Sequence, residues 1–298
     1  MRHTMDALNR HEKKQDFFIA LDSDGCVFDT MEVKQKECFI PNTCKFFDLK
    51  AVAKFARMAG EFVNLYSNGR GLNRYPALVQ IFDLLEEWDK VRERNAVIPK
   101  VPNLRQWIKV ETKLGNPALD SYCEQHDHED MHLVKAWSDA VNQSVREVVG
   151  DGIPPFPYVH ESLAKAKDRA DMLVCSQTPT EALVREWEEQ DLDAYVFTIA
   201  GQELGTKAEH IQYATRGHYP GDKMLMVGDA RGDQRTAEKT GALFFPILPG
   251  DEDVSWKRFY EEGLDRFFNR TFAGAYQEAL VEEFDRYLPD LPPWKQVK

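Results

Sequence analysis

The chain has 298 residues, of which 43% are hydrophobic and 30% are charged, the composition of a soluble globular protein with a full core. Its 50 Asp and Glu exceed its 38 Lys and Arg, and the net charge of −12 argues against nucleic acid or an anionic membrane surface as the main partner. An anionic small substrate is still allowed, because a bound metal ion can invert the local field.

The cysteines and the apolar runs bear on the compartment. The five cysteines are scattered without a zinc-type pairing, so we expect reduced thiols. No apolar run approaches the ~18 residues that a membrane span needs. These features predict a cytoplasmic protein without a membrane or nucleic-acid partner, and they leave the oligomeric state open.

The first informative stretch covers residues 17–29. Residues 17–21 form a short apolar run that predicts a buried parallel strand, and Asp22 and Asp24 follow it directly. Gly25 permits the turn that would bring both carboxylates to one site. Ligands of open α/β sheets bind outside the carboxyl ends of the strands, which is where this pair lies. Taken alone, the stretch fits an Asx-rich turn equally well.

Residues 31–150 show apolar positions at helical spacing and predict an inserted all-helical domain, with hinges near Thr30 and residues 150–152. Residues 67–74 form a Gly- and Asn-rich break within it. Arg70, Asn73 and Arg74 are the candidate substrate donors there. The alternative for this break is an ordinary exposed turn between two helices.

From residue 153 onward, strand and helix patterns alternate. We expect strands at 171–176, 195–199, 224–227 and 242–247, and this alternation predicts a parallel sheet with right-handed crossovers. Capping boxes are expected at Thr178 and Thr206, the second placing Lys207 at the start of a helix. The aromatic-rich tail after Asp251 should be helical and pack on the core. The predicted domains are therefore 1–30 and 151–298 for the core, with a C-terminal helical extension, and 31–150 for the insert.

Polar side chains gather at the expected strand ends. Parallel strands would bring them to one edge of the sheet, where several carboxylates repel one another unless a cation joins them. Oxygen ligands select a hard ion, and Mg²⁺ fits because it binds a few carboxylates together with phosphate. A hydroxyl, a lysine and helix N-terminal amides suit a phosphate group. The residues are Asp22, Asp24, Ser176, Lys207, Asp229 and Asp233.

The order of these motifs resembles the haloacid dehalogenase-like superfamily. Residues 22–25 match its D-x-D-G motif after an apolar strand, and Ser176 matches the strand-end hydroxyl. Lys207 stands for its lysine, and residues 228–233 match G-D-x-x-x-D. The resemblance implies an α/β fold, with a Rossmann-like core and, over residues 31–150, an inserted helical cap of the C1 type.

The resemblance also implies roles at the first two motifs. Asp22 would be the nucleophile that forms an aspartyl-phosphate, and Asp24 would protonate the leaving oxygen and then help to activate water. Ser176 and Lys207, with Gln177 beside them, would hold the phosphoryl group.

The metal set implied by the resemblance combines the first and fourth motifs. Asp22, Asp24 through its backbone carbonyl, and Asp229 would bind Mg²⁺, with Asp233 as a ligand or a support. The sequence therefore predicts a Mg²⁺-dependent phosphatase for a small phosphorylated metabolite. A phosphomutase is the close alternative, and a non-catalytic binding protein on the same fold is less favoured.

Overall fold

The computed structural model describes residues 3–150 and 152–295, and these form two compact units. Residues 3–31 and 152–287 make the core unit, and residues 32–150 and 288–295 make the helical unit. Residues 1–2, 151 and 296–298 of the predicted domains, including the middle of the second hinge, lie outside the described residues. Among the described residues, every helix is too short or too polar to cross a membrane.

The core unit is built on a five-stranded parallel sheet, which confirms the predicted α/β class. The strand order is β3-β2-β1-β4-β5, and all residues of β1, β2 and β4 are buried, as parallel strands covered on both faces require. The strands are β1 Phe17–Leu21, β2 Ala170–Cys175, β3 Thr198–Ala200, β4 Met224–Gly228 and β5 Leu243–Pro246. β3 begins three residues later than expected, because Asp193–Tyr195 form a 3₁₀ turn.

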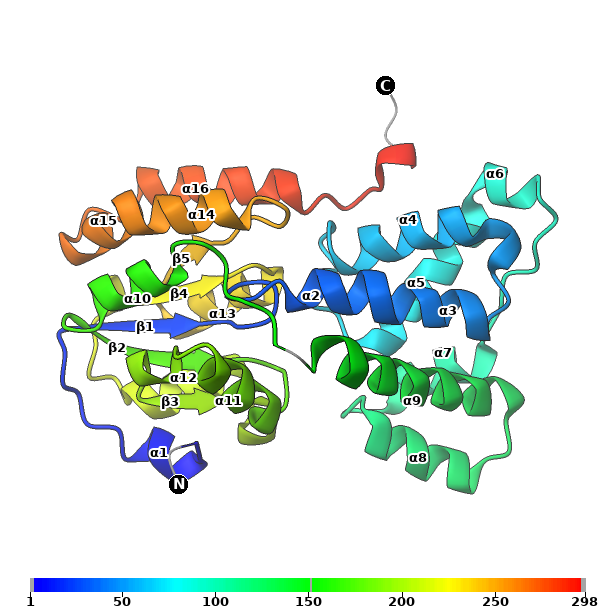
Figure 1. Ribbon diagram of the computed structural model, residues 1–298, viewed down its shortest axis with the longest axis horizontal. Helices are drawn as coiled ribbons and strands as arrows, with labels where there is room; N and C mark the ends of the chain where they lie inside the picture. Colours follow the sequence, from blue (N-terminus) through cyan, green and yellow to red (C-terminus); the bar gives the residue numbers. More distant parts are fainter. Residues whose placement is uncertain (1–2, 151, 296–298) are drawn as a thin grey trace. The chain divides into compact units, whose positions relative to one another are not determined.

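Helices surround this sheet, and the predicted helical tail is confirmed. Figure 1 shows α14 and α15 end to end alongside α16 at the β5 end of the core, and α11 and α12 near β2 and β3. Tail aromatic residues such as Trp256 and Phe272 are fully buried in the apolar cluster of the core. The helices are α1 Met5–Asn9, α10 Val159–Ala166, α11 Thr180–Glu189, α12 Lys207–Thr215, α13 Arg231–Thr240, α14 Glu252–Arg258, α15 Leu264–Phe268 and α16 Ala275–Tyr287, with a π-helical segment at Phe259–Gly263.

The two expected capping boxes have different outcomes. Thr206 accepts from the Glu209 N–H while Glu209 accepts from the Thr206 N–H, so this box is confirmed at the start of α12. The box at Thr178 is wrong, because α11 begins only at Thr180. The Thr178 hydroxyl instead donates to Asp24 Oδ2 at 2.7 Å, a contact between residues 154 positions apart.

The helical unit has an apolar core of its own. Trp107, Trp137, Tyr75 and Phe82 are its largest fully buried side chains. Its elements are α3 Ile40–Phe46, α4 Ala53–Asn64, α5 Arg74–Glu87, α6 Asp89–Arg92, α7 Pro102–Val110, α8 Asn116–Gln125 and α9 Glu129–Val149, preceded by a π-helical segment Lys34–Phe39. The short helix α2 Thr30–Val33 includes the boundary between the units.

The end of the chain departs from the predicted domain assignment. Residues 288–295 were expected in the core extension, but their contacts place them in the helical unit. Trp294 stacks on Trp88, with ring centroids 4.0 Å apart and planes 5° from parallel, and it meets Phe62 edge-on. An apolar ring buried against two other aromatic rings explains why the chain returns to this unit.

One buried carboxylate helps to fix the N-terminal segment to the core. Asp171, the second residue of β2, accepts from the N–H groups of Lys14 and Gln15, both at 2.9 Å, and from the Tyr219 hydroxyl at 2.6 Å. Burial alone would raise the pKa of Asp171, but contacts with His11 and these donors outweigh burial and lower the pKa to about 2. The ionised form is therefore the one that the folded state prefers.

We expect Asp171 to make the stability of the protein pH-dependent in acid. Its folded pKa lies below the ordinary value of 3.8, so its contribution is present above pH 3.8 and is lost as the pH falls through about 2. The shift corresponds to about 2 kcal/mol. Urea unfolding of the wild type and Asp171→Asn between pH 2 and 7 should show curves that differ at pH 6 and converge near pH 2. A constant difference across this range would contradict this assignment.

Candidate active site

The turn after β1 carries the first carboxylates out of the sheet. The Asp22 N–H donates to the Val227 carbonyl at 3.0 Å and so extends the pairing between β1 and β4 by one residue. Gly25, at φ 75°, then lets the chain turn, and its N–H donates to the Phe28 carbonyl at 2.9 Å. The strand order reverses between β1 and β4, and such a switch point is where ligands of open α/β sheets bind.

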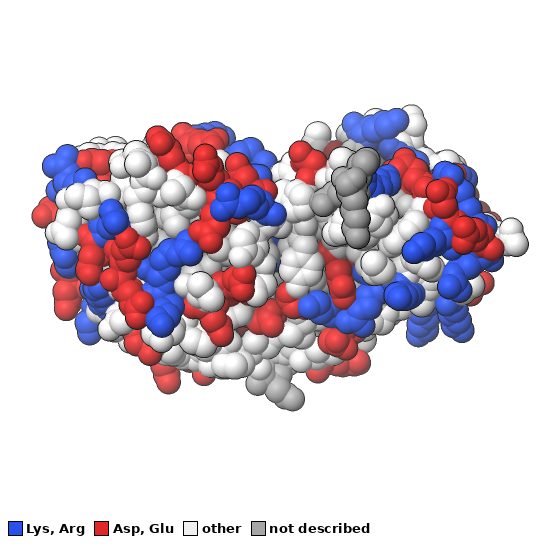
Figure 2. Space-filling view, turned by 90° about the horizontal axis from the view of Figure 1, so that it is seen from above, with Lys and Arg blue, Asp and Glu red and all other residues white. Residues whose placement is uncertain are grey.

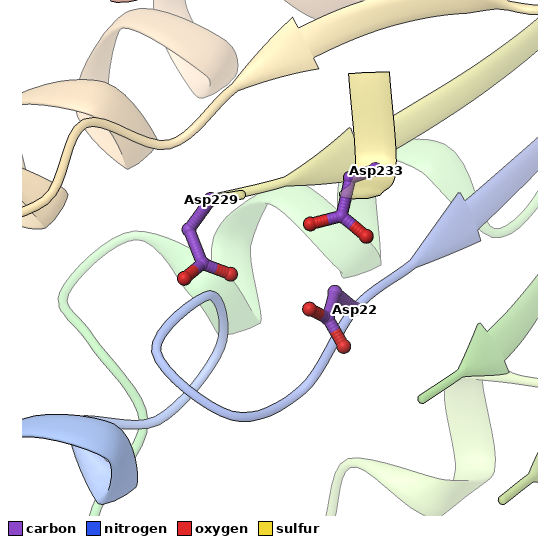
Figure 3. Close-up of side chains that lie close together, drawn as sticks. All are labelled: Asp22, Asp229 and Asp233. Atoms are coloured by element: carbon purple, nitrogen blue, oxygen red, sulfur yellow. The ribbon is translucent and has the colours of Figure 1, made fainter. Parts of the chain in front are cut away.

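Three buried carboxylates meet at this switch point (Figure 3). Asp22 follows β1, Asp229 follows β4, and Asp233 lies in the first turn of α13. One oxygen from each lies within 4.8 Å of the others, and the residues are 6%, 1% and 0% exposed. Like charges this close in a desolvated place destabilise one another, so the arrangement requires compensation.

Lys207 provides part of that compensation. Its ammonium group lies 2.6 Å from Asp22 Oδ2 and 2.5 Å from Asp233 Oδ1. Burial alone would lower the pKa of Lys207, but the two carboxylates outweigh burial and raise it well above its ordinary value. Burial raises the pKa of Asp22 to about 6 in spite of Lys207, and burial likewise raises the pKa of Asp233. One lysine beside three carboxylates leaves the group with excess negative charge.

The donor set fits a magnesium ion. Its atoms are carboxylate oxygens, which hard cations prefer. Ligands on opposite sides of Mg²⁺ are about 4 Å apart, close to the span of these oxygens. A divalent cation would also neutralise the charge that Lys207 leaves. Asp22, Asp229 and Asp233 are therefore the candidate ligands, and the Asp24 side chain does not belong to this group.

A glycine makes room for the third carboxylate. A Cβ on Gly228, the last residue of β4, would overlap Cβ and Cγ of Asp233. The Asp233 carboxylate also accepts from the Ala230 N–H at 3.1 Å, which fixes it over the start of α13. Gly232 contrasts with Gly228, since a Cβ there would have no atom within 4 Å.

Asp24, two residues after Asp22, has a different environment. It is half-buried, and two hydroxyl groups donate to it, Thr30 to Oδ1 and Thr178 to Oδ2. Sequence reasoning missed both threonines. Thr178 follows Ser176 by two residues and resembled a helix cap, whereas its contact with Asp24 depends on the folding of the sheet.

Two tryptophans that sequence reasoning also missed support the loop after β1. Trp187 of α11 donates from Nε1 to the Ser23 hydroxyl at 3.0 Å, and Trp256 of α14 donates to the Cys26 carbonyl at 2.7 Å. Both rings are fully buried. The loop is therefore held from two helices, which restricts the positions of Asp22 and Asp24.

The comparisons with known proteins concern the fold. No family model matches the chain, and no curated protein matches its sequence. The chain is similar in structure to a protein of Lactobacillus delbrueckii subsp. bulgaricus that is provisionally described as a phosphoglycolate phosphatase, with a TM-score of 0.51, 14% identity, and coverage of 86% of this chain and 99% of that one. A haloacid dehalogenase-like hydrolase of Xanthomonas campestris gives a TM-score of 0.45 at 10% identity, covering 88% and 96%.

The chain has the haloacid dehalogenase-like fold. Within this fold, Ser176 follows β2 and is buried, and its hydroxyl accepts from the Thr178 N–H at 3.3 Å. Gln177 is exposed, and its amide donates to the Gly205 carbonyl at 3.3 Å, just before α12. Ser176 thus directly follows β2, and Lys207 is the first residue of α12, which comes after β3 along the chain.

The three candidate donors of residues 67–74 have partners inside the helical unit. Arg70 is buried and donates to the Leu65 carbonyl at 3.0 Å, and Asn73 caps α5 by accepting from the Tyr75 N–H at 3.1 Å. Arg74 donates to neutral groups of α9, with Asn142 Oδ1 at 2.8 Å and Ser138 Oγ at 2.9 Å. All three therefore have structural roles, and substrate contact by them stays a prediction.

Arg74 also faces a small cavity in the helical unit. The guanidinium lies over the Phe39 ring at 4.9 Å, and burial lowers the pKa of Arg74. The cavity has a volume of about 10 Å³, and Gln35 and Trp137 also line it. Such a volume holds about one water molecule, so the cavity is too small for a metabolite.

Gly228 and Gly232 allow a matched test of the carboxylate group. Gly228→Ala should displace Asp233 and weaken Mg²⁺ binding, measured by titration calorimetry, at least ~10-fold, because a misplaced ligand loses most of its contribution. Gly232→Ala should leave the affinity within about twofold and the helix slightly more stable. Equal affinity in the two variants would show that the close approach of Asp233 is not needed for the ion.

Proposed function

We propose that the protein is a Mg²⁺-dependent phosphatase that hydrolyses a small phosphorylated metabolite through an aspartyl-phosphate. The observation that carries this proposal is the meeting of Asp22, Asp229 and Asp233 with Lys207 at the switch point of the sheet. The haloacid dehalogenase-like fold of the chain supports it.

Asp22 is the proposed nucleophile. A carboxylate oxygen of Asp22 attacks the phosphorus, and the bond from phosphorus to the ester oxygen breaks. Asp24 donates a proton to that leaving oxygen. In the second step, Asp24 takes a proton from water, the water oxygen attacks the phosphorus, and the Asp22 carboxylate is released with inorganic phosphate.

Ser176 and Lys207 are proposed to hold the phosphoryl group. Lys207 already contacts Asp22, so its charge lies where a phosphoryl group on Asp22 would need it. Asp22 and Asp229, with Asp233 and the Asp24 carbonyl, would bind Mg²⁺. When bound, the ion would neutralise charge on the nucleophile and the phosphate so that the two anions can approach.

The surface and the thiols are in keeping with this proposal. On the face shown in Figure 2, basic and acidic side chains are intermingled. All five cysteines are free, as a protein working in the reducing cytoplasm would have them. We propose a small phosphorylated metabolite as the substrate. The core would bind its phosphate group, and another part of the protein would recognise the rest of the substrate.

Substituting the nucleophile should abolish turnover. Asp22→Asn keeps the size of the side chain but removes the attacking carboxylate, and we expect a loss of at least ~10³-fold in phosphate release from p-nitrophenyl phosphate with Mg²⁺. Asp16→Asn is the control, since Asp16 precedes the same strand and its side chain is 77% exposed. Near wild-type turnover by Asp22→Asn would exclude the proposed mechanism.

Asp24 should matter most for a poor leaving group. Asp24→Asn should slow hydrolysis of an alkyl phosphate by ~10²–10⁴-fold and that of an aryl phosphate less, because an aryl oxygen can leave without a proton. The wild type should release one inorganic phosphate per substrate consumed. An isomeric phosphate ester formed without free phosphate would instead favour a phosphomutase.

We propose that the helical unit acts as the cap that recognises the rest of the substrate. Arg70→Ala and Arg74→Ala should then weaken turnover of the best substrate from a metabolite panel more than that of p-nitrophenyl phosphate. Since both side chains also support the helical unit, Arg57→Ala, whose side chain is 52% exposed, serves as the control. Equal losses on both substrates would assign the two arginines to structure alone.

A further inference from the structure

The chain crosses between the two units at three places. The first two crossings lie at residues 31–32 and 150–152, and the third lies between Tyr287 and Leu288. The segments that lead to the first two crossings run side by side in the core, where Phe28 and Pro155 form an antiparallel bridge and the Phe156 N–H donates to the Val27 carbonyl at 2.9 Å. Two adjacent crossings of this kind allow one unit to pivot about them.

The third crossing is anchored firmly on the core side. In the last turns of α16, Asp285 pairs with Arg231, and the Tyr287 hydroxyl donates to Asp251 Oδ2 at 2.5 Å. Arg231 is the first residue of α13, the helix that also holds Asp233. The core end of this crossing is therefore attached to the helix of the carboxylate site.

The crossing is anchored on the helical side without any intervening linker. The Pro289 carbonyl accepts from the Asn68 N–H at 3.3 Å, and Asp290 accepts from the Asn68 side chain at 2.9 Å. Trp294 stacks on Trp88, and Lys295 pairs with Glu87. Residues 288–295 thus contact both the break at 67–74 and the end of α5.

Residues 288–295 are also stiff. Three of these eight residues are the prolines Pro289, Pro292 and Pro293. Their fixed φ reduces the number of conformations that the segment can adopt. A flexible tail would follow the helical unit at little cost. A proline-rich segment that is held at both ends resists extension. Moving the two units apart would have to break the contacts that hold it.

We propose that residues 288–295 form a strap that limits the pivoting of the helical unit about the two adjacent crossings. The strap requires no ligand and does not depend on the reaction that the core catalyses. Its loss should widen the range of separations between the units while the carboxylate site stays intact.

Pulsed electron–electron resonance tests this proposal directly. Spin labels at Val97 and Val254, which are 86% and 53% exposed, report one distance between the units, in a background where Cys44→Ser and Cys123→Ser remove the two partly exposed thiols. The otherwise wild-type chain should give one narrow distribution. Trp294→Ala should widen it at least about twofold, and an unchanged width would overturn the proposal.

Two further variants separate the strap from general destabilisation. Leu119→Ala removes a fully buried side chain of α8, and should lower the melting temperature without widening the distribution. Asn68→Ala removes the side-chain hydrogen bond to Asp290 without opening a cavity, and keeps the backbone bond to Pro289, so it should widen the distribution even if Trp294→Ala fails to fold. Equal widening by Leu119→Ala, or none by Asn68→Ala, would also overturn the proposal.

Discussion

The repulsion among three desolvated carboxylates is the constraint on which the rest of the core depends. Asp22, Asp229 and Asp233 come from separate segments and are held within 4.8 Å of one another. Two features of the site bear directly on this close approach. Lys207 neutralises part of the charge, and Gly228 leaves the room that Asp233 needs. The parallel sheet fixes the approach itself, and a divalent cation is proposed to relieve the repulsion that remains.

The sheet and the place of the site could be predicted because short stretches carry their signals. An apolar run of five residues before Asp22 is enough to indicate a buried strand, and parallel strands must end at the same edge. From this, Asp22, Lys207, Asp229 and Asp233 were expected together, and the structure brings them together. Their roles in a reaction are not a matter of placement, and these stay predictions.

What the sequence could not show depends on contacts between distant residues. Thr178 has the local pattern of a helix cap, but the folded sheet offers it Asp24, 154 positions away, as a stronger acceptor. Residues 288–295 have no periodicity that could assign them to either unit. Their position follows from Trp88 and from Glu87, which pairs with Lys295 across 208 positions. Local patterns describe one partner of such contacts and leave the other unknown.

Asp22 and Asp24 are identical side chains two positions apart, and their surroundings differ. Lys207 can only donate hydrogen bonds, so its contact favours the ionised form of Asp22, the form that the proposed nucleophilic role needs. Thr30 and Thr178 face Asp24 instead, and a hydroxyl can donate to a carboxylate or, after rotation, accept from a carboxylic acid. These partners can satisfy Asp24 in both protonation states, which a group that gives and then takes a proton requires. The proposed division of labour between the two aspartates is therefore consistent with what surrounds each one.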